Sequence, residues 1–106
     1  MMNKDTFFKT LFKDSNKHEL KSSNLQSYHV GEDDTEVYNY KTCIAVLLKP
    51  SKTLLLNVNY YSSTTQRNQA KLIKEARANG YDIIVMGTGQ VFEHDDACIK
   101  TLALYR

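Results

Sequence analysis

The chain has 106 residues, of which 42% are hydrophobic and 25% charged, and its formal net charge is +2. This length and composition predict one globular domain with a single core, and they exclude a disordered or fibrous protein. The longest uncharged apolar run, 43–48, is far shorter than the roughly 20 residues of a membrane-spanning helix, and the N-terminus is charged where a signal peptide would be apolar. We therefore expect a soluble, cytoplasmic protein that does not associate with a membrane.

The first predicted element is a short amphipathic helix near the N-terminus, with Asn3 or Asp5 available as its N-cap. Its apolar side chains fall on one helical stripe: Phe7, Phe8, Leu11 and Phe12. They either cover the sheet or form an exposed patch for a partner, and we expect them to cover the sheet because large exposed apolar patches are uncommon on monomers. The polar stretch that follows, up to residue 24, reads as a connector.

Three strands are predicted after this connector. Residues 25–30 alternate weakly, and a glycine-led acidic turn at 31–34 follows them. Residues 37–48 alternate strongly and become apolar on both sides toward the end, which predicts one long central strand. A proline in the second position of 49–52 indicates a tight turn, and the third strand then occupies 53–61.

A long helix is predicted for residues 66–79, preceded by the capping-box spacing of 63–66, with Ser63 as N-cap, and ended by Gly80. Four bases form a basic ridge beside its apolar face: Arg67, Lys71, Lys74 and Arg77. The continuously apolar residues in 81–86 predict a last, buried strand. Residues 93–105 fit either a helix or an edge strand, and we favour the helix.

These elements predict an α+β fold: an antiparallel sheet of three to four strands with one long helix packed on it, plus a short N-terminal helix and the C-terminal helix or strand. We expect a single domain in which residues 1–24 form the helix and connector, 25–87 the sheet and main helix, and 88–106 a C-terminal segment. In a chain without an export signal, Cys43 and Cys98 are expected to be reduced thiols.

The junction between the third strand and the long helix is the first candidate site. A helix N-terminus presents unpaired N–H groups and a partial positive charge, which favour a phosphate or a carboxylate. The basic ridge would extend this contact along a nucleic-acid backbone, and a tyrosine could stack on a base. The candidate contact residues are Tyr61, Ser62, Thr64, Arg67, Lys71 and Lys74. Helix capping and solvation account for the same residues without a ligand.

An acidic cluster before the long strand is the second candidate site. It comprises Glu32, Asp33, Asp34 and Glu36, and it could present phosphate-like charge to a basic partner. Ordinary solvation of a turn explains the same cluster. Between residues 41 and 77 the chain has seven bases and one acid, so we expect the molecule to be electrically two-sided.

Neither a metal site, a cofactor nor an enzymatic activity is predicted. On a helix His94 and Cys98 would share a face, but two ligands are too few for zinc and no other His or Cys has suitable spacing. Cys43 lies within a predicted buried strand, where a thiol is inert. The glycines of 87–89 lack the third glycine and the following helix of a dinucleotide-binding motif.

Two segments of the chain carry a resemblance to a known family. Residues 38–46 read Tyr-Asn-Tyr-Lys-Thr-Cys-Ile-Ala-Val, and residues 61–65 read Tyr-Ser-Ser-Thr-Thr before a basic helix. This pattern resembles a family of small bacteriophage and mobile-element proteins that have a Tyr-x-Thr-x-(Val/Ile)-Ala strand and a Tyr-Ser-x-Thr-Thr junction. The match covers residues 37–80. Where those proteins often have a histidine after the Thr-Thr pair, this chain has Asn68.

The resemblance implies a phage accessory protein that acts in the cytoplasm of a host cell. Small phage proteins of this size include anti-CRISPR inhibitors, which usually act by binding. The leading expectation is therefore non-enzymatic binding that inhibits a host or defence protein. The alternative is a nucleic-acid-binding module that uses the basic helix.

Overall fold

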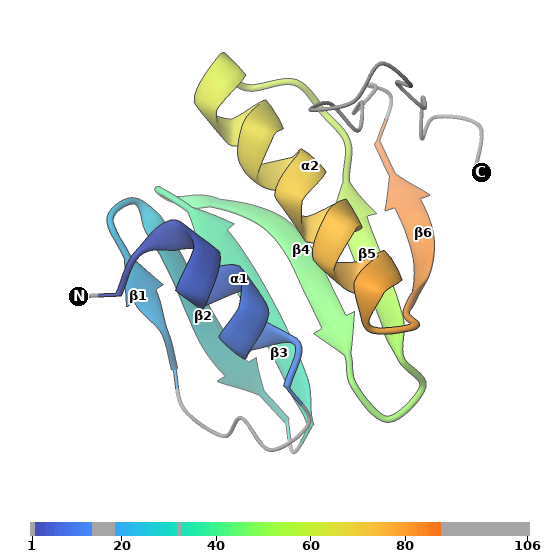
Figure 1. The fold of residues 1–106 in the computed structure, drawn as a ribbon. Helices are drawn as coiled ribbons and strands as arrows, with labels where there is room; N and C mark the ends of the chain where they lie inside the picture. The colour runs from blue at the N-terminus through green and yellow to red at the C-terminus, as the bar shows by residue number, and fades with distance from the viewer. Residues whose placement is uncertain (1, 14–18, 32, 88–106) are drawn as a thin grey trace.

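Two helices and six strands make up the described part of the chain, which comprises residues 2–13, 19–31 and 33–87 of this computed structural model (Figure 1). The helices are α1 (Lys4–Leu11) and α2 (Ser63–Ala78). The strands are β1 (Lys21–Ser22), β2 (Leu25–Val30), β3 (Asp34–Asn39), β4 (Thr42–Leu48), β5 (Thr53–Asn57) and β6 (Asp82–Met86). All six strands belong to one sheet, in which neighbours along the chain are also neighbours in space.

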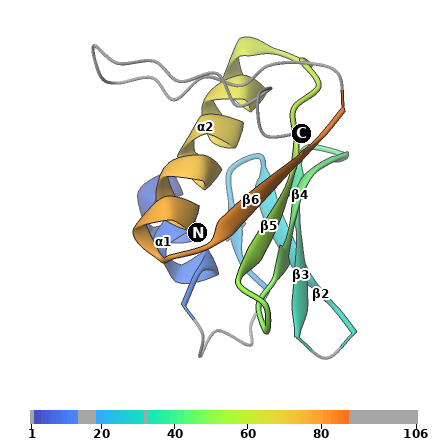
Figure 2. The same ribbon diagram turned by 90° about the vertical axis from the view of Figure 1, so that its right-hand side faces the viewer.

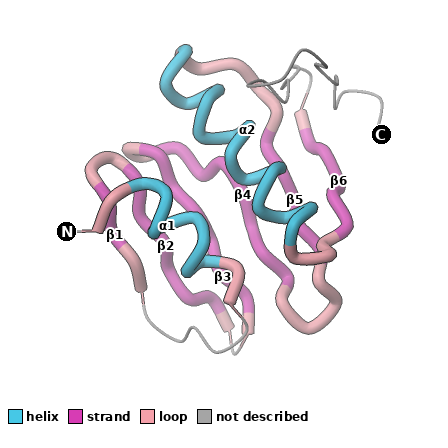
Figure 3. Tube along the Cα trace, in the orientation of Figure 1, coloured by secondary structure: helices cyan, strands magenta, loops and turns pink. Residues whose placement is uncertain are grey.

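The α+β class is confirmed, but the sheet is larger than predicted and mixed rather than antiparallel. Four neighbouring pairs are antiparallel, whereas β5 and β6 are parallel. Parallel neighbours need a long crossover connection, and α2 is the helix that returns the chain from the end of β5 to the start of β6 (Figure 3). A prediction of three to four antiparallel strands missed this geometry because it is set by the connection and not by the pattern of any one strand.

The predicted long strand over 37–48 is wrong, because the chain reverses in its middle. Tyr40 has φ +56°, a left-handed backbone, and with Lys41 it forms the turn of a β3–β4 hairpin. Left-handed conformations favour glycine and asparagine, so this turn lacks the usual sequence signal. A β-bulge lies beyond it: Val37 pairs with Ala45 and Tyr38 with Cys43, which leaves one extra residue between those partners.

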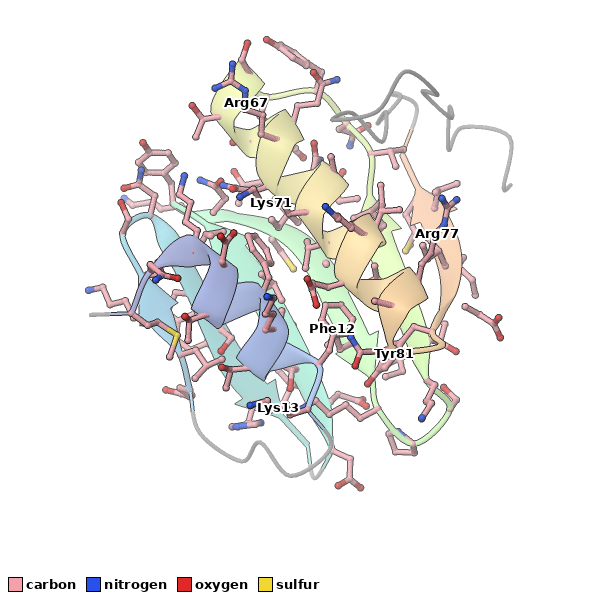
Figure 4. The ribbon with its side chains drawn as sticks, viewed as in Figure 1. Phe12, Lys13, Arg67, Lys71, Arg77 and Tyr81 are labelled. Atoms are coloured by element: carbon pink, nitrogen blue, oxygen red, sulfur yellow. The ribbon has the colours of Figure 1, made fainter. Side chains whose placement is uncertain are left out.

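Both helices cover the same face of the sheet, as the edge-on view shows (Figure 2). The prediction that the N-terminal phenylalanines cover the sheet is confirmed, since Phe7, Phe8 and Phe12 are all buried. Phe12 meets Tyr81 edge to face, with 5.0 Å between the ring centroids, and so joins the end of α1 to the start of β6 (Figure 4). One continuous core therefore lies between the sheet and the two helices.

The long helix begins three residues earlier than predicted. Its N-cap is Ser62, not Ser63, because Ser62 has extended backbone angles and its Oγ accepts the Thr65 N–H at 3.2 Å. The predicted end is confirmed: Gly80 follows the C-cap Asn79 with φ +74°.

Buried amide side chains fasten α2 to the sheet. Asn68 Nδ2 donates to Asn39 Oδ1 at 2.5 Å, and both residues are only 1% exposed. Gln69 Nε2 donates to the carbonyl groups of Asn57 and Asn59 at 2.6 and 3.1 Å. These carbonyls bond to the helix, so β5 ends at Asn57 and the predicted continuation to residue 61 is wrong.

The last predicted strand forms, but it is buried on one side only. β6 lies at the edge of the sheet, and Ile84 is 50% exposed while its neighbour Val85 is buried. The predicted C-terminal helix over 93–105, and with it His94 and Cys98, lies outside the described residues. Neither α1 nor α2 is long and apolar enough to cross a membrane.

Candidate functional site

The register of the sheet sorts the strand side chains onto two faces. Residues paired across neighbouring strands point to the same side, and successive residues point to opposite sides. One row faces the helices and is buried: Ser27, Val37, Ala45, Leu56 and Val85. The adjacent row faces away from them: Tyr28, Glu36, Val46, Leu55 and Ile84. We call this second side of the sheet the outer face.

No described element covers the outer face (Figure 2). This face nevertheless carries apolar and aromatic side chains. Ile84 and Met86 are 50% and 54% exposed. Tyr28 is 36% exposed, and its ring meets that of Tyr38 edge to face at a centroid distance of 5.5 Å. Adjacent exposed apolar side chains on a sheet commonly mark a surface that contacts another molecule.

The two faces differ in the balance of their charges. The two helices together contain six bases, at Lys4, Lys9, Arg67, Lys71, Lys74 and Arg77, and two acids, at Asp5 and Glu75. The outer-face rows of the strands contain three acids, Asp34, Glu36 and Asp82. Their one base is Lys21 of β1, which pairs with Gln26 at the edge of the sheet. An anionic ligand is therefore favoured on the helices and disfavoured on the outer face.

A pocket of about 250 Å³ opens at one end of the outer face, where β4 begins and β5 and β6 end. Its lining includes Cys43, Val46, Leu55, Asn57, Met86 and Gly87. Asn57 Nδ2 donates to the Cys43 carbonyl at 3.0 Å and to the Tyr61 hydroxyl at 2.9 Å. The strand-to-helix junction thus reaches this pocket through Tyr61.

Glu36, which lies in the outer-face row of Tyr28 and Val46, raises the pKa of two neighbouring groups, Cys43 and Tyr38. Burial, and next the negative charge of Glu36, raise the pKa of the Cys43 thiol. The pKa of Tyr38 is also raised, first by the hydrogen bond that its hydroxyl donates to Glu36 Oε1 at 3.2 Å. The raised pKa favours the neutral, weakly nucleophilic form of the thiol. Cys43 itself is only half-buried, so the prediction that it lies in a buried stretch of strand is wrong.

The predicted junction residues separate into a capping group and an exposed group. Ser62 Oγ is occupied by the N-cap bond and also donates to Thr65 Oγ1 at 3.1 Å. Thr64 is exposed at the start of α2, and Tyr61 is 45% exposed. Tyr61 and Arg67 therefore do not form one site, because the tyrosine hydroxyl bonds to Asn57 on the outer face whereas Arg67 lies on the helix.

The structure divides the predicted basic ridge. Arg67 and Lys74 are exposed, and Lys71 lies between them at helical spacing. Lys71 Nζ is 3.3 Å from Asp5 Oδ1 of α1, so part of its charge is neutralised. Arg77 extends toward β6 instead of toward α1 (Figure 4). The groove between the helices, about 300 Å³, has Lys9, Lys74 and Glu75 among its lining residues and is therefore of mixed charge.

The predicted acidic cluster is also divided. Asp34 and Glu36 lie on the outer face, Asp33 is exposed in the β2–β3 turn, and Glu32 lies outside the described residues. The apolar members of the outer face were not predicted as site residues: Tyr28, Val46, Leu55, Ile84 and Met86. Alternation within each strand indicated two faces, but the side that the helices leave uncovered depends on how the helices pack.

A comparison of the chain with known protein families, curated proteins and solved structures finds no match.

Proposed function

We propose that this chain is a non-enzymatic binding protein that covers part of the surface of a partner protein with the outer face of its sheet. The observation that carries this proposal is the combination of exposed apolar side chains, Tyr28, Ile84 and Met86, with three acids against one base in the outer-face rows of the strands. Apolar anchors favour a protein partner, and the carboxylates favour one with a basic rim.

The charge of the outer face argues against nucleic acid as the ligand there. Sheets that bind single strands combine stacking aromatic rings with lysines and arginines that follow the phosphates. Tyr28 and Tyr38 would supply the rings, but Glu36 lies in the same row as Tyr28 and pairs with it across the strands. Phosphates would be repelled at this position, whereas a lysine or arginine would be attracted.

The resemblance to small phage proteins suggests which class of protein the partner belongs to. On that basis the partner is a host or defence protein, such as a CRISPR nuclease, and binding inhibits it by occlusion. Co-expression with the host's CRISPR nuclease tests this class: the wild-type chain should relieve interference against a targeted plasmid. Interference that is unchanged at high expression would remove CRISPR nucleases from the proposal.

A pair of matched variants tests the surface. Tagged wild-type protein, Ile84→Lys on the outer face and Lys74→Glu on α2 are used as baits in host lysate, because residues 84 and 74 are both well exposed. The wild type and Lys74→Glu should retain one stoichiometric partner, and Ile84→Lys should bind it about tenfold or more weakly, as for an apolar hot spot. Retention by Ile84→Lys with loss in Lys74→Glu would contradict the proposal.

A second candidate function is nucleic-acid binding by the helical face, favoured by two exposed bases of α2, Arg67 in its first half and Lys74 in its second half. A mobility-shift titration compares the double variant Arg67→Glu, Lys74→Glu with Lys52→Glu, which changes an exposed lysine in the β4–β5 turn. The double variant should lose binding, Lys52→Glu should retain it, and affinity should fall as salt rises. Binding that is insensitive to salt would exclude this function.

A further inference from the structure

The pocket at the end of the outer face is too small for a typical small-molecule ligand. Its volume is about 250 Å³, and pockets that enclose drug-sized ligands are usually about 300–1,000 Å³. A space of this size suits a single side chain. Its position beside exposed Met86 and half-buried Cys43 also makes it continuous with the apolar row of the outer face.

Backbone irregularities keep this space open. The β-bulge after Cys43 removes one residue of β4 from the regular alternation. Gly87 has φ +104°, and a Cβ at this position would lie 2.6 Å from Asn59 Oδ1. A side chain at position 87 would therefore be strained and would displace the asparagine, so the rim of the pocket stays bare on this side.

The polar groups at the pocket are already used within the protein. Asn57 Nδ2 donates to two oxygens, and its Oδ1 accepts the Asn59 N–H at 2.9 Å. The Cys43 thiol donates to the Ala45 carbonyl at 3.6 Å. An incoming group consequently gains little from hydrogen bonding here and gains most from burying apolar surface.

A carboxylate, that of Glu36, lies next to the pocket. Glu36 is the cross-strand partner of Val46, which lines the pocket, and its charge reaches far enough to raise the pKa of Cys43. Asp34 and Asp82 lie one outer-face row farther from Cys43, and Lys21 lies in the row of Cys43 but three strands away, on β1. Among residues of a partner that could flank the pocket, lysine and arginine are therefore favoured, and aspartate and glutamate are disfavoured.

We propose that this pocket is the anchor point of the interface, receiving one large apolar side chain, phenylalanine or leucine, that the partner presents beside a lysine or arginine. The inference rests on the proposed function and specifies how the outer face would recognise its partner. Single buried anchors of this kind commonly supply most of the affinity of an interface.

Three short capped peptides test the recognition directly, in titrations followed by amide chemical shifts of the full chain. The first has a phenylalanine between two arginines, the second replaces the phenylalanine by alanine, and the third replaces the arginines by glutamates. The first should shift the amides of Cys43, Val46 and Met86. The other two should bind about tenfold or more weakly. Absence of these shifts at millimolar peptide, or equal binding of the alanine peptide, would overturn the inference.

Two variants of the pocket itself give a second test. Cys43→Phe occupies the space from within, and Met86→Ala removes apolar surface from its exposed rim without adding bulk. Both variants should abolish or strongly weaken the shifts caused by the first peptide while retaining the dispersed spectrum of a folded chain. If Cys43→Phe fails to fold, Met86→Ala decides: full retention of peptide binding in that variant rejects the anchor.

The same variants separate this inference from the proposed function. If Ile84→Lys loses the captured partner while Met86→Ala and a folded Cys43→Phe keep it, the outer face is the interface and the pocket is not its anchor. If all three variants keep the partner, the proposed function falls as well.

Discussion

At the scale of single residues, Cys43 reports the electrostatics of the outer face. Its pKa is raised by burial and then by the charge of Glu36, so less thiolate is present at a given pH than for an exposed cysteine. In a Cys98→Ser background, iodoacetamide should alkylate Cys43 slowly at neutral pH. The rate should rise as the pH increases toward the raised pKa.

Removing the neighbouring charge supplies the control for this prediction. Glu36→Gln should lower the pKa of Cys43 and speed alkylation at a fixed pH. Asp34→Asn removes an outer-face charge from a different row, so it should leave the rate close to that of the Cys98→Ser background. Equal rates in all three proteins would show that Glu36 does not act on the thiol.

Single residues also explain why the hairpin within 37–48 escaped prediction. Tyr40 and Lys41 are not common turn residues, and the left-handed backbone of Tyr40 is held by contacts that appear only in the folded chain. Its N–H donates to the Asn24 carbonyl at 2.7 Å, and its hydroxyl accepts from Asn24 Nδ2 at 2.7 Å. The one available warning was length, since 12 residues is about twice the mean strand.

At the scale of elements, the start of α2 distinguishes two adjacent serines. Ser62→Ala should lower the free energy of unfolding by about 1 kcal/mol, because it removes the acceptor of the Thr65 N–H. Ser63→Ala should change it by less than about 0.5 kcal/mol, because Ser63 is exposed inside the first turn. Urea denaturation of the two variants measures the difference, and equal losses would contradict the cap assignment.

Local patterns predicted the elements better than their arrangement. The stripe of Phe7, Phe8 and Leu11 predicted α1. The hydroxyl residues before α2 and the glycine after it predicted the bounds of α2 to within three residues. The parallel pairing of β6 depends on where α2 packs, and no alternation pattern records that. The apolar part of the candidate site could not be predicted for the same reason, because it lies on the sheet face that the helices leave uncovered.

At the scale of the whole molecule, the shared core and not the ion pair should hold α1 against the rest. Phe7 is fully buried, so Phe7→Ala should lower the free energy of unfolding by about 3–5 kcal/mol. Lys71→Ala breaks the contact with Asp5, but the two side chains are 38% and 77% exposed, so the loss should stay below about 1 kcal/mol. Thermal and urea unfolding compare them, and a larger loss for Lys71→Ala would contradict this balance.

The helix between the last two strands also has a consequence for synthesis. Each of the strands β1 to β5 pairs with a strand that is adjacent in sequence, so both partners are synthesised at nearly the same time. Thr53 of β5 can pair with Asp82 of β6 only after the whole of α2 has been synthesised. We expect the nascent chain to bury its hairpins first and to close the far edge last. Pulse-labelled hydrogen exchange during refolding should find the amides of β6 protected after those of β3 and β4.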